Sequence, residues 1–156
     1  MEDLAGLSEF LVAAKKSSYP SGSEGTKTKD NSTLYEYKEK DWKYHDQFYG
    51  AADRFLGHET VWKKKKPAWG MNYHGVRLDT LFEEQRLYSF LREALKQVEA
   101  SLPLRGPEKY ESNNLRYTNF STGDLRSFRG VEFIYETGRA IYQLDYHGGA
   151  LSKPVA

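Results

Sequence analysis

Apolar residues recur at helical spacing in two stretches of the chain, and each stretch predicts an amphipathic helix. The first runs from Leu4 to Lys16 and the second roughly from Thr80 to Ala100. Asp79 or Thr80 can cap the start of the second helix. The apolar stripes consist of Leu4, Leu7, Phe10, Leu11 and Ala14 in the first helix, and of Leu87, Phe90, Leu91, Ala94, Leu95 and Val98 in the second.

Short, aromatic-rich, alternating segments follow each helix and favour β-strands. They lie between Leu34 and Tyr73 and between Tyr110 and Tyr146, with about four strands in each. Residues 17–33 are rich in Ser, Gly, Thr and Lys, and are expected to form a flexible loop. Short connections between the strands imply antiparallel pairing.

The chain also aligns with itself, which indicates an internal repeat. A shift of 73 places residues 37–75 on residues 110–148 without a gap, and nine of the 39 columns are identical. We therefore expect a single α+β domain over residues 1–156, a tandem, pseudo-twofold duplication of an α-β-β-β-β unit. The repeats cover about 4–75 and 81–148, with antiparallel sheet and two helices packed on one face. A barrel wrapped around a helix is the alternative closure.

The last hairpin of each repeat determines which side chains should face the helices. Thr137-Gly138 has the composition of a two-residue turn, which pairs Tyr135 with Ala140 and Phe133 with Tyr142. A one-residue slip in register would exchange the two faces. The expected core face carries Val131, Phe133, Tyr135, Tyr142, Leu144 and Tyr146, and in the first repeat His58, Thr60, Trp62, Trp69, Met71 and Tyr73.

The opposite face is the best functional candidate, because polar residues recur there at matching positions. If the sheet is curved and this face is open, these groups could line a cleft that binds a ligand. Tyr44 and Asp46, which alternate along the second strand, could lie nearby. The candidate ligand-binding residues are Glu59, Asn72, His74, Glu132, Asp145, His147, Tyr44 and Asp46.

Each of these groups also has a purely structural interpretation. The two glutamates could hydrogen-bond neighbouring turns, the two histidines could be solvated at strand ends, and tyrosines beside a carboxylate are often structural. Asp145 and His147 could bind a divalent metal, but only two ligands are visible on that strand. No metal site is therefore predicted.

Composition excludes several classes of protein. The 156 residues contain no Cys, which excludes disulfides, thiolate metal sites and Cys nucleophiles. The formal net charge of +1 argues against a protein that coats nucleic acid or an anionic membrane. No apolar run approaches the roughly 20 residues needed to span a bilayer, and the start Met1-Glu2-Asp3 lacks the features of a secretion signal. We expect a cytoplasmic protein.

Motifs for common chemistry are absent from the sequence. It contains no GxGxxG, GxxxxGK[ST], HExxH or GxSxG, so no cofactor is expected. The run Lys63–Lys66 lies at an expected hairpin tip and is interpreted as a solvated turn rather than a phosphate-binding loop. Most of the strong aromatics fall on the expected core face, which argues against stacking on single-stranded nucleic acid.

Several segments carry a resemblance to a known family: residues 10–16, Asp41-Trp42 with Tyr44 and Asp46, Phe55, Gly57, Glu59 and Val61, residues 65–73, Phe128, Gly130, Glu132, and residues 146–149. Together they resemble an uncharacterised prokaryotic family, a domain of unknown function that in some relatives follows a Cro/repressor-type helix-turn-helix. That fusion suggests a sensing role. Here Met1 begins directly at the domain, so the resemblance does not imply DNA binding.

The leading hypothesis is a non-enzymatic sensor or binding module that recognises a small polar ligand or a protein partner through the polar face. The first alternative is an enzyme that uses a Glu/His acid–base set on the same face. The second is an interaction domain, such as a homodimer, in which that face is buried between chains.

Overall fold

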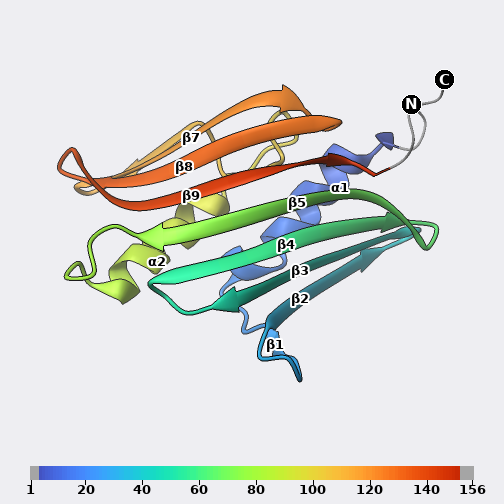
Figure 1. The fold of residues 1–156 in the computed structure, drawn as a ribbon. Helices are drawn as coiled ribbons and strands as arrows, with labels where there is room; N and C mark the ends of the chain where they lie inside the picture. Colours follow the sequence, from blue (N-terminus) through green and yellow to red (C-terminus); the bar gives the residue numbers. More distant parts are fainter. Residues whose placement is uncertain (1–3, 152–156) are drawn as a thin grey trace.

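The computed structural model describes residues 4–151, which form one nine-stranded sheet and two α-helices (Figure 1). The elements are α1 (Leu7–Lys16), the 3-10 turn η2 (Tyr19–Ser21), β1 (Thr26–Lys27), β2 (Thr33–Glu39), β3 (Trp42–Gly50), β4 (Arg54–Lys63), β5 (Lys66–Arg77), α2 (Glu84–Leu95), β6 (Lys109–Ser112), β7 (Leu115–Asp124), β8 (Ser127–Glu136) and β9 (Arg139–Ala150).

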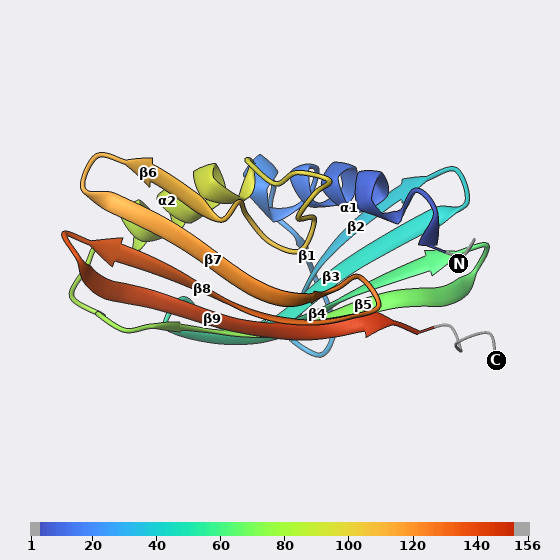
Figure 2. The same cartoon turned by 90° about the horizontal axis from the view of Figure 1, so that it is seen from above.

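The strands follow the order β1-β2-β3-β4-β5-β9-β8-β7-β6, and every neighbouring pair is antiparallel. The sheet is therefore open, with β1 and β6 at its edges, and the barrel alternative does not apply. Both helices lie on the same side of the curved sheet (Figure 2). The two predicted strand-rich regions meet at the centre, where Tyr73 of β5 pairs with Tyr146 of β9.

The apolar stripes predicted for the helices form the upper layer of the core. Leu7, Leu11 and Ala14 of α1 and Leu87 and Ala94 of α2 are completely buried against the sheet. Burial of these faces supplies most of the stability of such short helices, because isolated helices of this length are marginal in water. The existence and the buried faces of both helices are thus confirmed, but α2 ends at Leu95, five residues before the predicted end at Ala100.

The start of the second helix was predicted four residues too early. α2 begins at Glu84, and neither Asp79 nor Thr80 caps it. The reason is Arg77, a buried guanidinium that donates hydrogen bonds to the carbonyl oxygens of Thr80 and Phe82, at 3.2 and 2.7 Å. These bonds hold residues 80–82 in a separate turn before the helix.

The predicted faces of β4 and β8 are wrong, and the cause is a β-bulge. The turn at Thr137-Gly138 and the pair Tyr135–Ala140 form as expected, but the register then shifts and Ile134 pairs with Tyr142. One extra residue, Ile141, lies in β9 at this point, so the residues of β8, Tyr135 included, lie on the face opposite to the predicted one.

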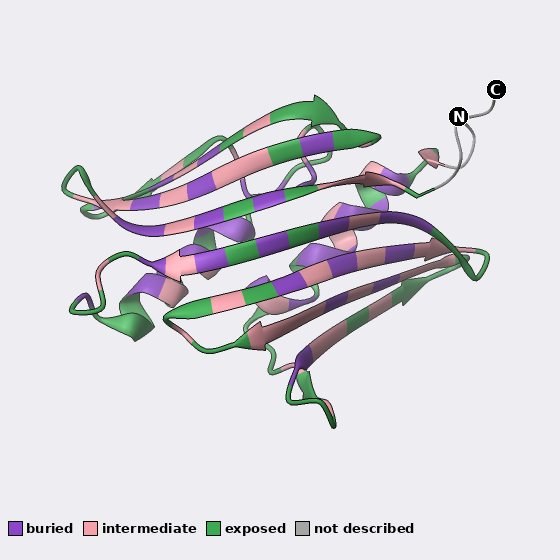
Figure 3. Cartoon of the chain, in the orientation of Figure 1, coloured by how far each residue is buried: buried purple, intermediate pink, exposed green. Residues whose placement is uncertain are grey.

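The same irregularity occurs between β4 and β5, where the register shifts between Val61 and Trp62 and Ala68 is the extra residue in β5. Figure 3 shows the resulting alternation of buried and exposed residues along β5 and β9. Trp69, Met71, Tyr73, Tyr142, Leu144 and Tyr146 face the helices as predicted. Their partners on that face are Glu59, Val61, Glu132 and Ile134, whereas His58, Thr60, Trp62, Val131, Phe133 and Tyr135 lie on the opposite, outer face.

The residues 17–33, expected to form a flexible loop, contain η2 and the short strand β1. β1 adds to the edge of the sheet by pairing with β2. Pro20 is buried, and η2, which includes the partly buried Tyr19, contacts α2. This segment therefore helps to close the space between the helices and the sheet.

Gly130 allows close packing of a neighbouring aromatic ring. A Cβ atom at this position would lie 2.2 Å from Cζ of Tyr146, whose hydroxyl is held by Asn119 at 2.7 Å. We expect Gly130→Ala to lower the free energy of unfolding by about 1–3 kcal/mol, because the ring cannot move without losing that bond. Urea denaturation measures the effect.

Gly70→Ala is the matched control, because a Cβ atom at this position would lie 3.3 Å from its nearest neighbour, the carbonyl oxygen of Glu59. Its effect should stay below about 1 kcal/mol. Equal effects of the two substitutions would contradict the role assigned to the Tyr146 ring.

Candidate functional site

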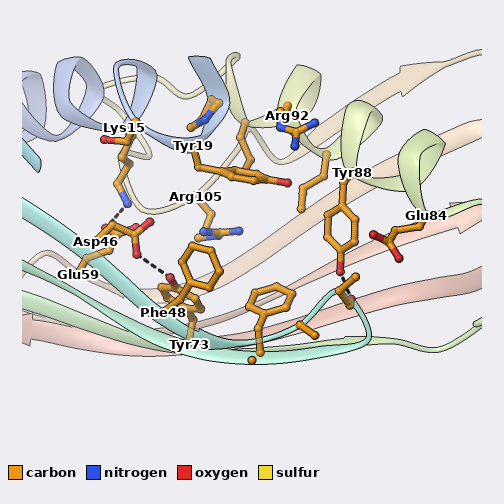
Figure 4. A pocket seen from close by; sticks show the side chains of 18 of the residues that line it. Lys15, Tyr19, Asp46, Phe48, Glu59, Tyr73, Glu84, Tyr88, Arg92 and Arg105 are labelled. Carbon is orange, nitrogen blue, oxygen red and sulfur yellow. Dashed lines mark hydrogen bonds and ion pairs between the residues drawn. The ribbon is translucent and has the colours of Figure 1, made fainter. Parts of the chain in front are cut away.

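A cavity of about 550 Å³ lies between the helices and the first half of the sheet (Figure 4). This volume is in the range of small-molecule sites. Apolar and aromatic side chains make up much of its wall, and polar groups gather on the β3–β5 side. Its lining includes Lys15, Tyr19, Tyr44, Asp46, Phe48, Phe55, Glu59, Tyr73, Leu91, Arg92 and Arg105.

Lys15 and Glu59 form a buried ion pair at one end of the cavity. The ammonium of Lys15 lies 2.5 Å from Oε2 of Glu59 and 2.6 Å from the carbonyl oxygen of Leu104. Their side chains are only 7% and 2% exposed. Burial lowers the pKa of Lys15, and the opposing effect of the Glu59 charge is smaller.

Asp46 lies directly opposite Glu59 on the neighbouring strand, so two carboxylates are adjacent in a buried place. The Tyr73 hydroxyl donates a hydrogen bond of 2.6 Å to Oδ1 of Asp46. Burial, followed by the charge of Glu59, raises the pKa of Asp46 to about 7. This carboxyl group therefore changes charge near neutral pH.

A second buried cluster surrounds Glu132 on β8. Arg105, from the connection between α2 and β6, donates to Oε1 of Glu132 at 2.8 Å, and the Tyr117 hydroxyl donates to Oε2. Tyr142 donates a longer bond of 3.4 Å to Oε1. Burial raises the pKa of Tyr117 and Tyr142 well above the usual value, so both hydroxyls remain donors. Glu132 is thus fully satisfied within the chain.

Arg105 also reaches the cavity, because its guanidinium lies 5.6 Å above the ring of Tyr73. The Tyr19 ring lies under the half-buried guanidinium of Arg92 at 5.0 Å. The hydroxyls of Tyr19 and Tyr44 have no hydrogen-bond partner within residues 4–151, and both side chains line the cavity. They are available to a ligand.

The structure divides the predicted ligand-binding residues between two faces. Tyr44, Asp46, Glu59 and Glu132 lie under the helices, and the first three line the cavity. The other four predicted residues, Asn72, His74, Asp145 and His147, are exposed on the outer face, where Asn72 pairs with His147 and His74 with Asp145. The eight residues therefore do not form one site, and the Glu/His pairs needed for the acid–base alternative are separated by the sheet.

Within residues 4–151, no group of three or more His, Cys, Asp or Glu side chains could hold a metal ion. No helix in this part of the chain is long and apolar enough to cross a membrane.

Residues 46–151 match the family described as a domain of unknown function, DUF5680. The chain belongs to this family. Comparison with curated proteins and with solved structures finds no match. The DUF5680 match includes Asp46, Glu59, Arg105 and Glu132, whereas Lys15 on α1 lies before it.

Lys15 and Arg105, the cations paired with the buried glutamates of this DUF5680 chain, are among the site residues that the sequence analysis missed. Lys15 lies next to Ala14 at the edge of the apolar stripe of α1, and Lys16 beside it is exposed, so the pattern alone does not distinguish them. Arg105 follows Leu104 in a connection without periodicity. The sequence signal that could have pointed to them is the pair of glutamates on the strands, Glu59 and Glu132, because a buried glutamate needs a cationic partner.

Proposed function

We propose that this DUF5680 domain is a small-molecule-binding module, and that the ligand occupies the cavity between α1, η2, α2 and strands β3–β5. The observation that supports this proposal is a cavity of about 550 Å³ whose wall combines apolar rings with buried ionisable groups. A purely structural core would be filled, because interiors pack at the density of organic crystals. A binding role also agrees with the predicted sensor or binding module.

The cavity offers both parts of a typical ligand site. Phe48, Phe55 and Leu91 provide apolar surface, while Asp46 and the Tyr44 hydroxyl provide polar groups that could orient a ligand. The rigid sheet carries the polar groups, and helix α2 and the η2 segment cover them. This arrangement fits recognition of a ligand with an apolar body and a polar end.

Blocking the cavity should abolish ligand binding. Leu91→Trp places a larger side chain on α2 at a buried position of the cavity wall. In a screen of aromatic fragments by ligand-observed NMR, we expect binding to the natural protein and its loss, by at least tenfold in affinity, in this variant. Ser89→Trp is the matched control, because Ser89 is exposed on the same helix and does not line the cavity.

Thermal unfolding of both variants verifies that they are folded. Fragment binding that survives Leu91→Trp, or no fragment binding by the natural protein, would contradict the proposed function.

We also infer that a tandem duplication of an α-β-β-β-β unit produced this single domain, with repeats at about 4–75 and 81–148. The 73-residue shift that aligns the two regions also relates the two β-bulges, which lie at Val61/Trp62 and Ile134/Tyr135. It relates two equivalent hydrogen bonds as well, from Tyr73 to Asp46 and from Tyr146 to Asn119.

A further inference from the structure

The buried ionisable groups beside the cavity include one more carboxylate than cationic side chains. Three carboxylates, from Asp46, Glu59 and Glu132, are each at most 7% exposed. Within the described residues 4–151, two cations lie among them, the ammonium of Lys15 and the guanidinium of Arg105. Arg92 also lines the cavity, but it is partly exposed and its charge is screened by solvent.

Asp46 is the carboxylate without a cationic partner. Lys15 bonds to Glu59, and Arg105 bonds to Glu132. Oδ1 of Asp46 accepts the Tyr73 hydrogen bond, and Oδ2 has no hydrogen-bond or ion-pair partner within residues 4–151. Because Asp46 lines the cavity, a ligand could supply the missing partner.

Asn119, 73 residues after Asp46, shows how a side chain at this position can be fully hydrogen-bonded within the protein. Asn119 lies directly opposite Glu132 on the neighbouring strand, just as Asp46 lies opposite Glu59. Its Oδ1 accepts from Tyr146 at 2.7 Å, and its Nδ2 donates to the Gly106 carbonyl at 2.9 Å. The neutral amide is thus satisfied on both sides. Asp46 keeps the tyrosine bond but adds a charge, and its second oxygen has no partner within residues 4–151.

Aromatic side chains line the cavity together with Asp46. Tyr73 donates to the carboxylate itself, and Tyr44 and Phe48 come from the same strand, β3, at positions that share its face. The faces of aromatic rings attract cations, so rings combined with a single carboxylate favour an organic ammonium group. A divalent metal is not favoured, because the described residues contain no cluster of three metal-ligating side chains.

The geometry points to an organic cation as the ligand of this cavity, a primary or secondary amine on an aromatic or apolar body whose ammonium pairs with Asp46. This inference rests on the proposed function, and it names the ligand class for the same cavity. The ammonium would supply the missing positive charge, and the apolar body would contact Phe48, Phe55 and Leu91.

Proton exchange should accompany the binding. The charged and titratable groups that face Asp46 are Lys15 of α1, Tyr35 of β2, Glu59 of β4, Tyr73 of β5, Tyr44 of its own strand and Arg105. Their combined effect with burial gives Asp46 a pKa of about 7 without a ligand. An ammonium beside the carboxylate stabilises its charged form, so binding at pH 7 should release part of a proton from Asp46 to the solvent.

The test uses three probes of the same shape and different charge: 2-naphthylmethylamine, 2-naphthylmethanol and 2-naphthoate. Isothermal titration calorimetry at pH 8 should show the amine binding at least tenfold more tightly than the alcohol, with the carboxylate weakest. In Asp46→Asn the amine and the alcohol should bind equally, because Asn119 shows that an amide accepts the same tyrosine hydrogen bond. Titrations at pH 7 in buffers of different ionisation enthalpy should show proton release with the amine only.

An advantage of the amine that persists in Asp46→Asn would overturn the inference, and so would a preference for the carboxylate or equal binding of the amine and the alcohol. Equal binding that Leu91→Trp abolishes would leave the proposed function intact and remove only the cation. No binding of any probe would also overturn the cation assignment, and the fragment screen would then decide separately whether the cavity binds a ligand.

Discussion

Replacing Lys15 by methionine is expected to lower the free energy of unfolding by about 3–5 kcal/mol. The substitution keeps the volume and apolar stem of the side chain but removes the ammonium that lies 2.5 Å from Glu59. Glu59 is 2% exposed and has Asp46 as its direct neighbour across the strands, so its charge would remain buried without compensation. The carbonyl oxygen of Leu104 would lose its donor as well.

The double variant Lys15→Met/Glu59→Gln should recover most of this loss, because it removes the uncompensated charge along with the cation. Lys16→Met is the matched control, since Lys16 is exposed on the same helix and should change stability by at most about 0.5 kcal/mol. Urea denaturation followed by circular dichroism measures the free energy of unfolding of the natural protein and of these three variants. A double variant no more stable than Lys15→Met would contradict the account of the buried pair.

Asp46→Asn is expected to make the protein more stable, by an amount that grows with pH. The pKa of Asp46 is about 7 in the folded protein, against 3.8 for an ordinary aspartate. A raised acid pKa means that the folded state binds the proton more tightly than the unfolded state does. The contribution of Asp46 to folding stability is therefore greatest below about pH 4, falls as the pH rises from about 4 to 7, and is constant above that.

An amide does not titrate, so the variant lacks this loss. Its stability relative to the natural protein should increase by up to about 4 kcal/mol between pH 4 and pH 8. The measurement is urea denaturation of both proteins at several pH values. Asp145→Asn is the matched control on the exposed outer face, and its difference from the natural protein should not follow this pH dependence. A constant difference for Asp46→Asn between pH 5 and pH 8 would show that Asp46 takes up no proton on folding.

The two predictions concern different consequences of one arrangement. Asp46 and Glu59 are opposite each other on β3 and β4, and Lys15 pairs with Glu59 alone. Removing the lysine leaves two buried negative charges, whereas removing the Asp46 charge leaves a balanced pair. The stabilising substitution identifies Asp46 as the excess charge that a cationic ligand would neutralise, and the destabilising one tests whether Lys15 is needed to compensate Glu59.

Much of the candidate site could be predicted from the sequence as individual residues but not as a group. Tyr44, Asp46 and Glu59 were identified because they recur 73 residues later with the same or similar chemistry. Their place in the molecule was not predictable, because one extra residue in β5 and in β9 reverses the faces of β4 and β8. A bulge leaves no clear mark in a local pattern, since Ala68 and Ile141 are ordinary strand residues.

The sequence by itself determined the elements. Helical stripes and alternating strands arise from contacts between residues close along the chain, so α1, α2 and the hairpins could be inferred without knowing their partners. Only the tertiary structure decided the pairing of β5 with β9, the inward position of Glu59 and Glu132, and the arrival of Lys15 and Arg105 beside them. Those features depend on register and on residues far apart in the chain, and the charge imbalance at Asp46 exists only once these groups are brought together.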